Sequence, residues 1–305
     1  MRILVPQTFE ILSTNVAGST YANYSSTTTY ALGAKVYIPD VGYWGEYKCL
    51  VAGTVGVDPR TSVYNAESNP SGKWEFLGVT NRYKMFDQFG NTQTVNAGTI
   101  DVSLLALDTE ALFLGNLDAY SILIEVIDNA TAEIIETAEF ELYPDVQDWL
   151  DYFYGHWLDS NRKTQIVYER TTLTRNVSYR VKIDNGENDA KCGIMIVGAL
   201  QEFGYAKLKV EMGIEDYSTI KKDTSTGATY ISKGNFAKVM GFDIFTPTGT
   251  VARIYDMLAR LHGTPIVATQ TNFELFNVYG YFQSSKTVCE NEQETAITGV
   301  IMGLI

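Results

Sequence analysis

Short apolar runs separated by turn residues dominate the chain, and this pattern most constrains its fold. The run 121–127 is the clearest, because Ile122, Ile124 and Val126 alternate onto one face of a strand while the opposite face is also largely apolar. A strand that is apolar on both faces fits the core of a β-sandwich. The segment 128–131 offers Asx turn chemistry and predicts a hairpin to the run 133–142. The sequence therefore predicts a mainly β protein.

Four parts can be distinguished along the 305 residues, a length that allows more than one core. The first, 1–30, contains a short strand and a stretch rich in Ser, Thr, Asn and Tyr, which we expect to be an extended arm. The second, 31–80, has aromatic runs between turn residues and is expected to form a small β module. We expect 81–198 to form a β-sandwich and 199–305 to form an α+β domain.

One amphipathic helix of about 13 residues is expected in the last part. Its apolar stripe consists of Val251, Ile254, Leu258 and Leu261. Thr250 precedes the stripe as a candidate N-cap, and Gly263 with Pro265 predicts the end of the helix. A second, short helix is expected over 145–154, where Val146, Trp149, Leu150 and Phe153 repeat at helical spacing.

The charge balance makes nucleic acid an improbable partner. The net charge is −13, and no cluster of Lys and Arg is present that could neutralise phosphates. The same acidity would repel an anionic membrane surface, and no stretch approaches the roughly 20 apolar residues of a membrane span. The apolar run at residues 3–5 is too short for a signal peptide, so we expect a soluble product made in the cytoplasm.

Catalytic and metal-binding constellations are not evident. The three cysteines, Cys49, Cys192 and Cys289, are far apart in sequence and predict buried thiols rather than a disulfide framework or a zinc site. The histidines, His156 and His262, have no neighbouring nucleophile. His262 is expected to interact with the carbonyls that end the predicted helix, and His156 to belong to an aromatic turn.

Carboxylates need a separate test, since a pair of them can hydrolyse glycosides without histidine. The neighbours Asp101, Asp108 and Glu110, and the pair Glu215 and Asp216, are candidates, but 36 acids in the chain make such neighbours unavoidable. The segment 184–189 offers oxygen ligands for calcium but lacks EF-hand spacing, so a solvated hairpin turn is the preferred interpretation. No phosphate-binding glycine loop is found. We expect no enzymatic activity, no cofactor and no metal.

Aromatic residues of the small module are the most suggestive binding feature. They are Tyr43, Trp44, Tyr47 and Trp74. Flat rings can stack on sugar faces, which is one way a non-catalytic module binds carbohydrate. The same rings can instead form the core of a small domain, and this is the preferred interpretation. If the rings do form a platform, Tyr43 and Trp44 are expected to be its exposed pair.

Two stretches resemble a family of bacteriophage tail and tail-tip proteins. The run 74–87, WEFLGVTNRYKMFD, is similar to the junction W-x-x-x-G-x-T-N-R-[WY]-x-M-F-D of that family, with Tyr83 where relatives typically have Trp. Residues 33–37 and 47–49 with Trp74 resemble a small chitin-binding-like module. The second stretch comprises 192–198, 213–218 and 236–238, followed by the predicted helix and the strand 264–267. Val267, Ala268 and Thr269 depart from the family's pattern, because relatives often have aromatic residues there.

The resemblance implies a structural component of a phage tail, in the tip, baseplate or collar, and hence a protein of the virion. It implies a jelly-roll or galactose-binding-like sandwich over 81–198, with the junction residues Asn81, Arg82, Met85, Phe86 and Asp87 acting as an inter-domain scaffold. Other tail proteins would be partners, and the chain would form a trimer or hexamer. The alternatives are a carbohydrate-binding protein that recognises a host surface glycan, and a polysaccharide hydrolase.

Overall fold

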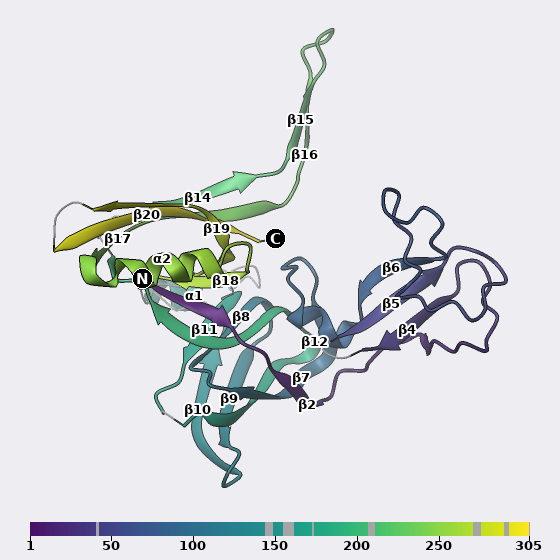
Figure 1. Cartoon of the computed structure of the whole chain (residues 1–305), viewed down its shortest axis with the longest axis horizontal. Coiled ribbons are helices and arrows are strands. Elements are labelled where there is room, and N and C mark those ends of the chain that lie inside the picture. Colours follow the sequence, from purple (N-terminus) through teal and green to yellow (C-terminus); the bar gives the residue numbers. More distant parts are fainter. Residues whose placement is uncertain are drawn as a thin grey trace.

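The computed structural model describes residues 1–40, 43–143, 149–154, 162–172, 174–206, 211–270, 276–289 and 293–304. The described part is mainly β, as predicted, with a large antiparallel sheet, a four-stranded sheet and a two-stranded hairpin (Figure 1). No helix within it has the length and apolar character needed to cross a membrane.

A long strand, β12 (Asn176–Glu202), organises the large sheet. Its first half lies between β7 (Thr94–Leu107) and β9 (Ser121–Asp128), its second half pairs with β8 (Ala111–Asp118), and its end pairs with β1 (Arg2–Pro6). Alternate residues of β9, of most of β7 and of the first half of β12 are buried in one core, which includes the predicted Ile122, Ile124 and Val126. The predicted boundary at residue 198 therefore falls inside a continuous strand.

Three shorter strands complete this central region. β2 (Glu10–Thr14) pairs with β7, β11 (Gln165–Glu169) pairs with β8, and β10 (Glu133–Glu141) pairs with β9. The β9–β10 pairing confirms the hairpin predicted at 128–131, where Asp128 Oδ1 accepts a bond of 2.8 Å from the amide of Ala130.

The C-terminal region places one helix beside a sheet. The sheet consists of β13 (Tyr205–Ala206), β14 (Glu211–Asp216), β17 (Phe236–Pro247), β18 (Ile266–Thr269), β19 (Val278–Cys289) and β20 (Glu294–Gly303).

The helix, α2 (Val251–Arg260), buries Ile254 and Leu258 as predicted, and Gly263 follows it with φ 69°. The 3₁₀ turn η3 (Thr248–Thr250) precedes α2. Thr250 does not cap the helix with its side chain, because its hydroxyl donates to the Pro247 carbonyl at 2.8 Å.

The N-terminal strand β1 ties the two regions together. It lies between β12 and β18, so its backbone pairs with the end of the central sheet on one side and with the C-terminal sheet on the other. Ile3 is buried in the C-terminal core, whereas Leu4 is buried against Phe113 and Val267 on the opposite face. β1 is thus an internal strand of the large sheet.

One local prediction is wrong, and a second, the short helix, is confirmed for 149–154. The segment 184–189 is a bulge inside β12 rather than a hairpin turn, because β7 pairs on both sides of it with Asp184 opposite Thr99 and Asp189 opposite Ala97. The short helix exists as α1 (Trp149–Tyr154), but the described part of its predicted apolar stripe is exposed, at 78% for Trp149 and 66% for Phe153. Val146 lies outside the described residues.

The small module has its own four-stranded sheet and core. Its strands are β3 (Ala22–Asn23), β4 (Lys35–Pro39), β5 (Trp44–Cys49) and β6 (Trp74–Val79). The 3₁₀ helix η1 (Asn81–Phe86) connects β6 to β7. A further hairpin, β15 (Thr219–Lys222) with β16 (Thr229–Ser232), projects from the C-terminal region away from the rest of the chain (Figure 1).

We expect Leu4→Ala to lower the free energy of unfolding by about 2–5 kcal/mol, because it leaves a cavity between the two halves of the sheet. The matched control is Leu12→Ala on β2, where the side chain is 53% exposed and the change should cost less than about 1 kcal/mol. Urea denaturation followed by circular dichroism measures both values. Equal losses in the two variants would contradict the role assigned to β1.

Candidate functional site

Two of the four predicted sugar-binding rings form the core of the small module. Trp74 is 0% exposed and Tyr47 is 3% exposed. The indole N–H of Trp74 donates to the Val57 carbonyl at 3.0 Å, and Tyr30 packs edge-on at 5.3 Å between ring centroids. Neither ring therefore presents a face to a ligand, and the core interpretation holds for both.

Trp44 lies at the joint between the module and the rest of the chain. Its ring stacks on Tyr37 at 5.5 Å and packs against Tyr83 of η1 at 5.9 Å. The guanidinium of Arg82 lies over the same indole at 5.3 Å, a cation–π contact. Gly18 packs so closely on the ring that a Cβ there would overlap it. The prediction of Tyr43 and Trp44 as an exposed pair is therefore wrong for Trp44, whereas Tyr43 is 42% exposed.

The scaffold residues of η1 connect the module to the central region. The Asn81 side chain donates to the Val95 carbonyl at 2.7 Å and accepts from the Val95 amide at 3.0 Å, as a paired strand residue would. Met85 is fully buried in the central core, and Phe86 packs on Phe9 at 4.7 Å. These contacts join η1 to the central core. Arg82 differs, since it contacts Trp44 and makes no ion pair with Asp87 in the described structure.

Asp87 organises the loop that follows η1. Its carboxylate accepts from the Phe89 amide at 2.8 Å and from the Thr92 hydroxyl at 2.9 Å. Burial raises the pKa of Asp87, although these hydrogen bonds act in the opposite direction. The Asp87 carboxyl is therefore half-buried, and both of its oxygens accept hydrogen bonds from the loop.

An aromatic groove opens beside the joint, between the module and η1. It has a volume of ≈ 430 Å³ and is lined by Tyr43, Phe76, Val79, Tyr83, Phe86 and Asp87. Phe76 is 45% exposed, although Trp74, two residues earlier on β6, is buried and alternate residues of a strand normally face the same side. Neither Phe76 nor Tyr83 was predicted from the sequence to bind a ligand. Their position in the WEFLGVTNRYKMFD run was the sequence feature that could have identified them as candidate binding residues.

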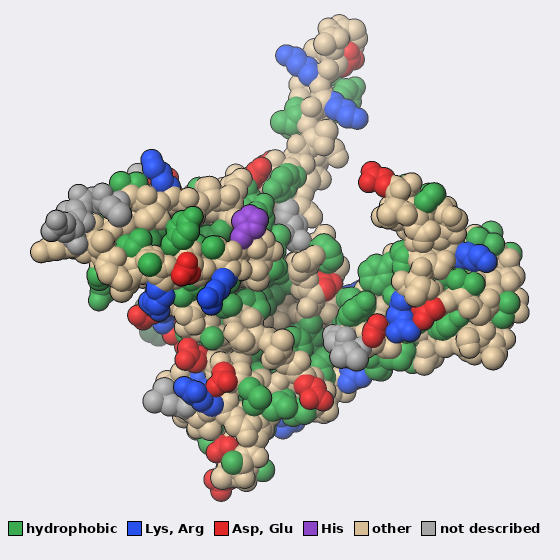
Figure 2. Space-filling view, in the orientation of Figure 1, with side chains coloured by type: hydrophobic (Ala, Val, Ile, Leu, Met, Phe, Trp, Pro, Cys, Tyr) green, Lys and Arg blue, Asp and Glu red, His purple; other side chains and the backbone are tan. Residues whose placement is uncertain are grey.

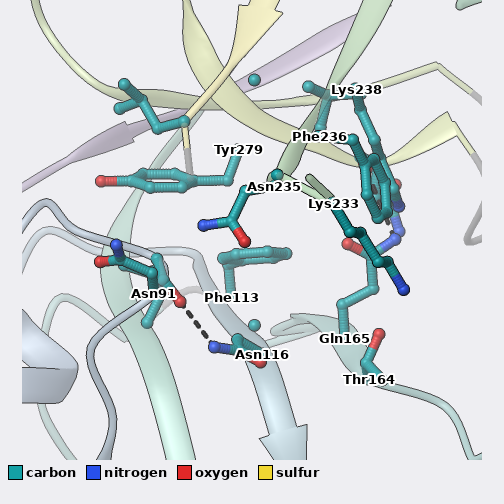
Figure 3. Close-up of a pocket in the computed structure, with 18 residues that line it drawn as sticks. Asn91, Phe113, Asn116, Thr164, Gln165, Lys233, Asn235, Phe236, Lys238 and Tyr279 are labelled. Atoms are coloured by element: carbon teal, nitrogen blue, oxygen red, sulfur yellow. Dashed lines mark hydrogen bonds between the residues drawn. The ribbon is translucent and has the colours of Figure 1, made fainter. Parts of the chain in front are cut away.

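A second cleft of ≈ 490 Å³ lies between the central and C-terminal regions (Figure 3). Phe113 of β8 and Tyr279 of β19 stack across it at 6.3 Å, and amides from Asn91, Asn116 and Asn235 face the same space. Asn116 is fixed by donating to the Gly90 carbonyl at 2.6 Å. Lys233 and Lys238 also line the cleft, so its lining combines stacked rings, amides and two basic side chains.

Tyr279 links this cleft to the joint. Its hydroxyl donates to the Gln88 carbonyl at 3.1 Å, next to Asp87 in sequence. Burial raises the pKa of Tyr279, and the negative charge of Asp87 raises it further, so the phenol remains a donor at neutral pH. The loop 87–92 therefore connects the groove and the cleft.

The described side chains that were considered for catalysis either form ion pairs or hydrogen bonds with neighbouring residues or are exposed to solvent. Asp101 pairs with Arg180 at 2.8 Å, Asp108 pairs with Arg175 at 3.7 Å, and Glu110 accepts from the Leu200 amide at 3.3 Å. Glu215 and Asp216 are exposed on β14. His262 is exposed just after α2, and His156 lies outside the described residues.

Cysteine and metal chemistry were also expected to be absent. Cys49 and Cys192 are free and buried, and burial raises the pKa of Cys192 to about 12, so its thiol stays protonated. The side chain of Cys289 lies outside the described set. Within the residues that the structure describes, no group of three or more His, Cys, Asp or Glu side chains could hold a metal ion.

No protein-family model, no curated protein and no solved structure matches the chain. The function is therefore inferred from the geometry above and from the sequence motifs.

We expect Trp44→Ala to loosen the module from the central region, because it removes the ring that Tyr37, Tyr83 and Arg82 share. Small-angle X-ray scattering should show a broader distance distribution, and unfolding of the module should become easier by about 1–3 kcal/mol. Tyr43→Ala, one residue away but exposed, is the control and should leave the scattering profile unchanged. A Trp44→Ala profile identical to wild type would show that the indole does not hold the joint.

Proposed function

We propose that the chain is a structural component of a bacteriophage tail, in the tip, baseplate or collar, and that it acts without catalysis or a cofactor. The observation that carries the proposal is the joint at 74–87. The residues that resemble the phage junction are the ones whose side chains fasten the module: Trp44 packs on Arg82 and Tyr83, and Asn81 pairs with β7. A rigid joint suits a protein that must present a module in a fixed direction.

The finer fold assignment belongs to the same proposal. We take the central strands as a galactose-binding-like sandwich and the C-terminal region as the assembly domain. The burial of alternate residues in β7, β9 and β12 in one core supports the sandwich. The projecting hairpin supports the assembly role, because an isolated two-stranded hairpin is marginally stable in water. The proposed assembly is a homotrimer or homohexamer that contacts other tail proteins.

Glycan recognition at the aromatic groove is the second candidate function. Tyr43 and Phe76 give exposed ring faces of the kind that stack on sugars, and Asp87 supplies an acceptor for sugar hydroxyls. A volume of ≈ 430 Å³ lies in the usual range for small-molecule sites. The groove differs from the predicted platform, since it keeps Tyr43 but contains Phe76 and Tyr83 in place of Trp44, Tyr47 and Trp74.

Membership of the virion can be tested directly. We expect mass spectrometry of purified particles to detect the polypeptide at a fixed copy number, and antibody labelling in electron micrographs to mark the tail. Capsids separated from tails provide the control. Particles that lack the polypeptide would overturn the proposed function.

The glycan candidate has its own test. Phe76→Ala and Tyr43→Ala should each weaken binding to host cells or to a surface glycan by about 0.5–1.5 kcal/mol, the amount typical of one aromatic contact. Tyr64→Ala is the matched control, because Tyr64 is 47% exposed in the same module but does not line the groove. Equal binding by all three variants on a glycan array would reject the groove as a sugar site.

A further inference from the structure

The β15–β16 hairpin exposes apolar side chains along its whole length. Every residue of both strands is exposed, and the larger apolar side chains include Ile220 at 67%, Tyr230 at 64% and Ile231 at 70%. Tyr217, at the base, is 49% exposed. Exposed apolar patches of this kind usually mark an interaction surface, because leaving them in water is unfavourable.

Hydrogen bonds at both ends give the hairpin a definite shape. At the tip, Asp223 accepts from the Ser225 amide at 2.8 Å and from the Thr226 hydroxyl at 2.7 Å, and Gly227 adopts φ 73°. At the base, the Tyr217 amide donates to the Asn235 carbonyl at 3.0 Å. A hairpin closed at the tip and at the base is preorganised to dock, so less entropy is lost on binding.

The charge of the hairpin is opposite to that of the chain. Residues 217–233 contain Lys221, Lys222 and Lys233 but only one acid, Asp223, whereas the whole chain carries −13. Within the described structure, Lys221 and Lys222 pair with no carboxylate. Figure 2 shows these basic and apolar side chains together on the projecting arm. The hairpin therefore suits an acidic surface with apolar side chains, and the remainder of this chain is acidic.

The strand β10 offers such a surface. It pairs only with β9 in the described structure, so its second edge has no strand partner there. Glu136, in the middle of β10, accepts from the Thr171 and Thr172 amides. Glu133, Glu139 and Glu141 are exposed and form no ion pair within the described residues, and Ile134 is 54% exposed on the same strand. Acidic side chains also gather over this lower end of the molecule in Figure 2. Among the described residues, β10 thus combines an unpaired edge, negative charge and an exposed apolar side chain.

We propose that the hairpin of one copy docks along β10 of a second copy of the same chain. The two surfaces lie at opposite ends of the molecule, the hairpin at the top and β10 at the bottom of Figure 1, so one chain cannot join them by itself. A contact between two different surfaces repeats from copy to copy and closes into a ring when the rotation allows. This inference deepens the proposed function, because it names the contact by which the tail component assembles.

Charge reversal tests the contact. The wild-type chain should sediment as an oligomer that dissociates as salt rises, since salt screens exposed charges. The variant Lys221→Glu with Lys222→Glu, and separately Glu139→Lys with Glu141→Lys, should raise the dissociation constant at least about tenfold, because like charges then meet. The chain carrying all four changes should recover the oligomer, because the charges are again complementary.

The control is Arg253→Glu with Lys286→Glu, which makes the same charge change at two other exposed positions of the C-terminal region and should leave association unchanged. Circular dichroism confirms that each variant is folded. A monomeric wild-type chain, unchanged association in the lysine variant, or no recovery in the fourfold variant would each overturn the docking. Detection of the polypeptide in virions is a separate result, so failure of the contact and failure of the proposed function are distinguishable.

Discussion

Backbone pairing of β1 with both β12 and β18 holds the two large regions of the molecule in one sheet. The first residues of the chain thereby pair with two strands that lie far later in the sequence, β12 (Asn176–Glu202) and β18 (Ile266–Thr269). Gly198 and Gly280 show how close this packing is, because a Cβ at either position would overlap the backbone of a neighbouring strand. Since β1 pairs on both sides, the cleft lined by Phe113 and Tyr279 has a fixed position relative to the central strands. The same holds for the base of the hairpin.

Local patterns in the sequence predicted the elements of this structure well. Alternation identified β9, Asx chemistry identified the β9–β10 hairpin, and the stripe through Ile254 and Leu258 identified α2. Each of these signals depends on residues that are close in sequence. The length of β12 depends instead on pairing with four other strands, β1, β7, β8 and β9, so no local signal separates its bulge at 184–189 from an ordinary turn.

The candidate site was predictable in composition but not in arrangement. The sequence indicated that aromatic residues of the small module matter, and the structure separates them by burial: Trp74 and Tyr47 stabilise the core, Trp44 holds the joint, and Tyr43 lines the groove. This division could not be predicted because a ring that packs in a core and a ring that stacks on a sugar are the same residue type. The cation–π contact of Arg82 with Trp44, which places Trp44 at the joint, connects residues 38 positions apart in the sequence.

In the proposed docking between copies, the basic hairpin of a highly acidic chain has a physical role. Net charge of one sign keeps copies apart in solution, so an assembling protein needs a local reversal of charge to attract its own kind. The hairpin supplies this reversal far from the bulk of the negative charge, and its exposed Ile220 and Ile231 add a short-range apolar attraction that salt does not screen. β10, in turn, keeps its edge charged, which discourages pairing with edges that lack the complementary lysines. Charge on the two elements thus permits one pairing and opposes others, which is the requirement for ordered assembly rather than aggregation.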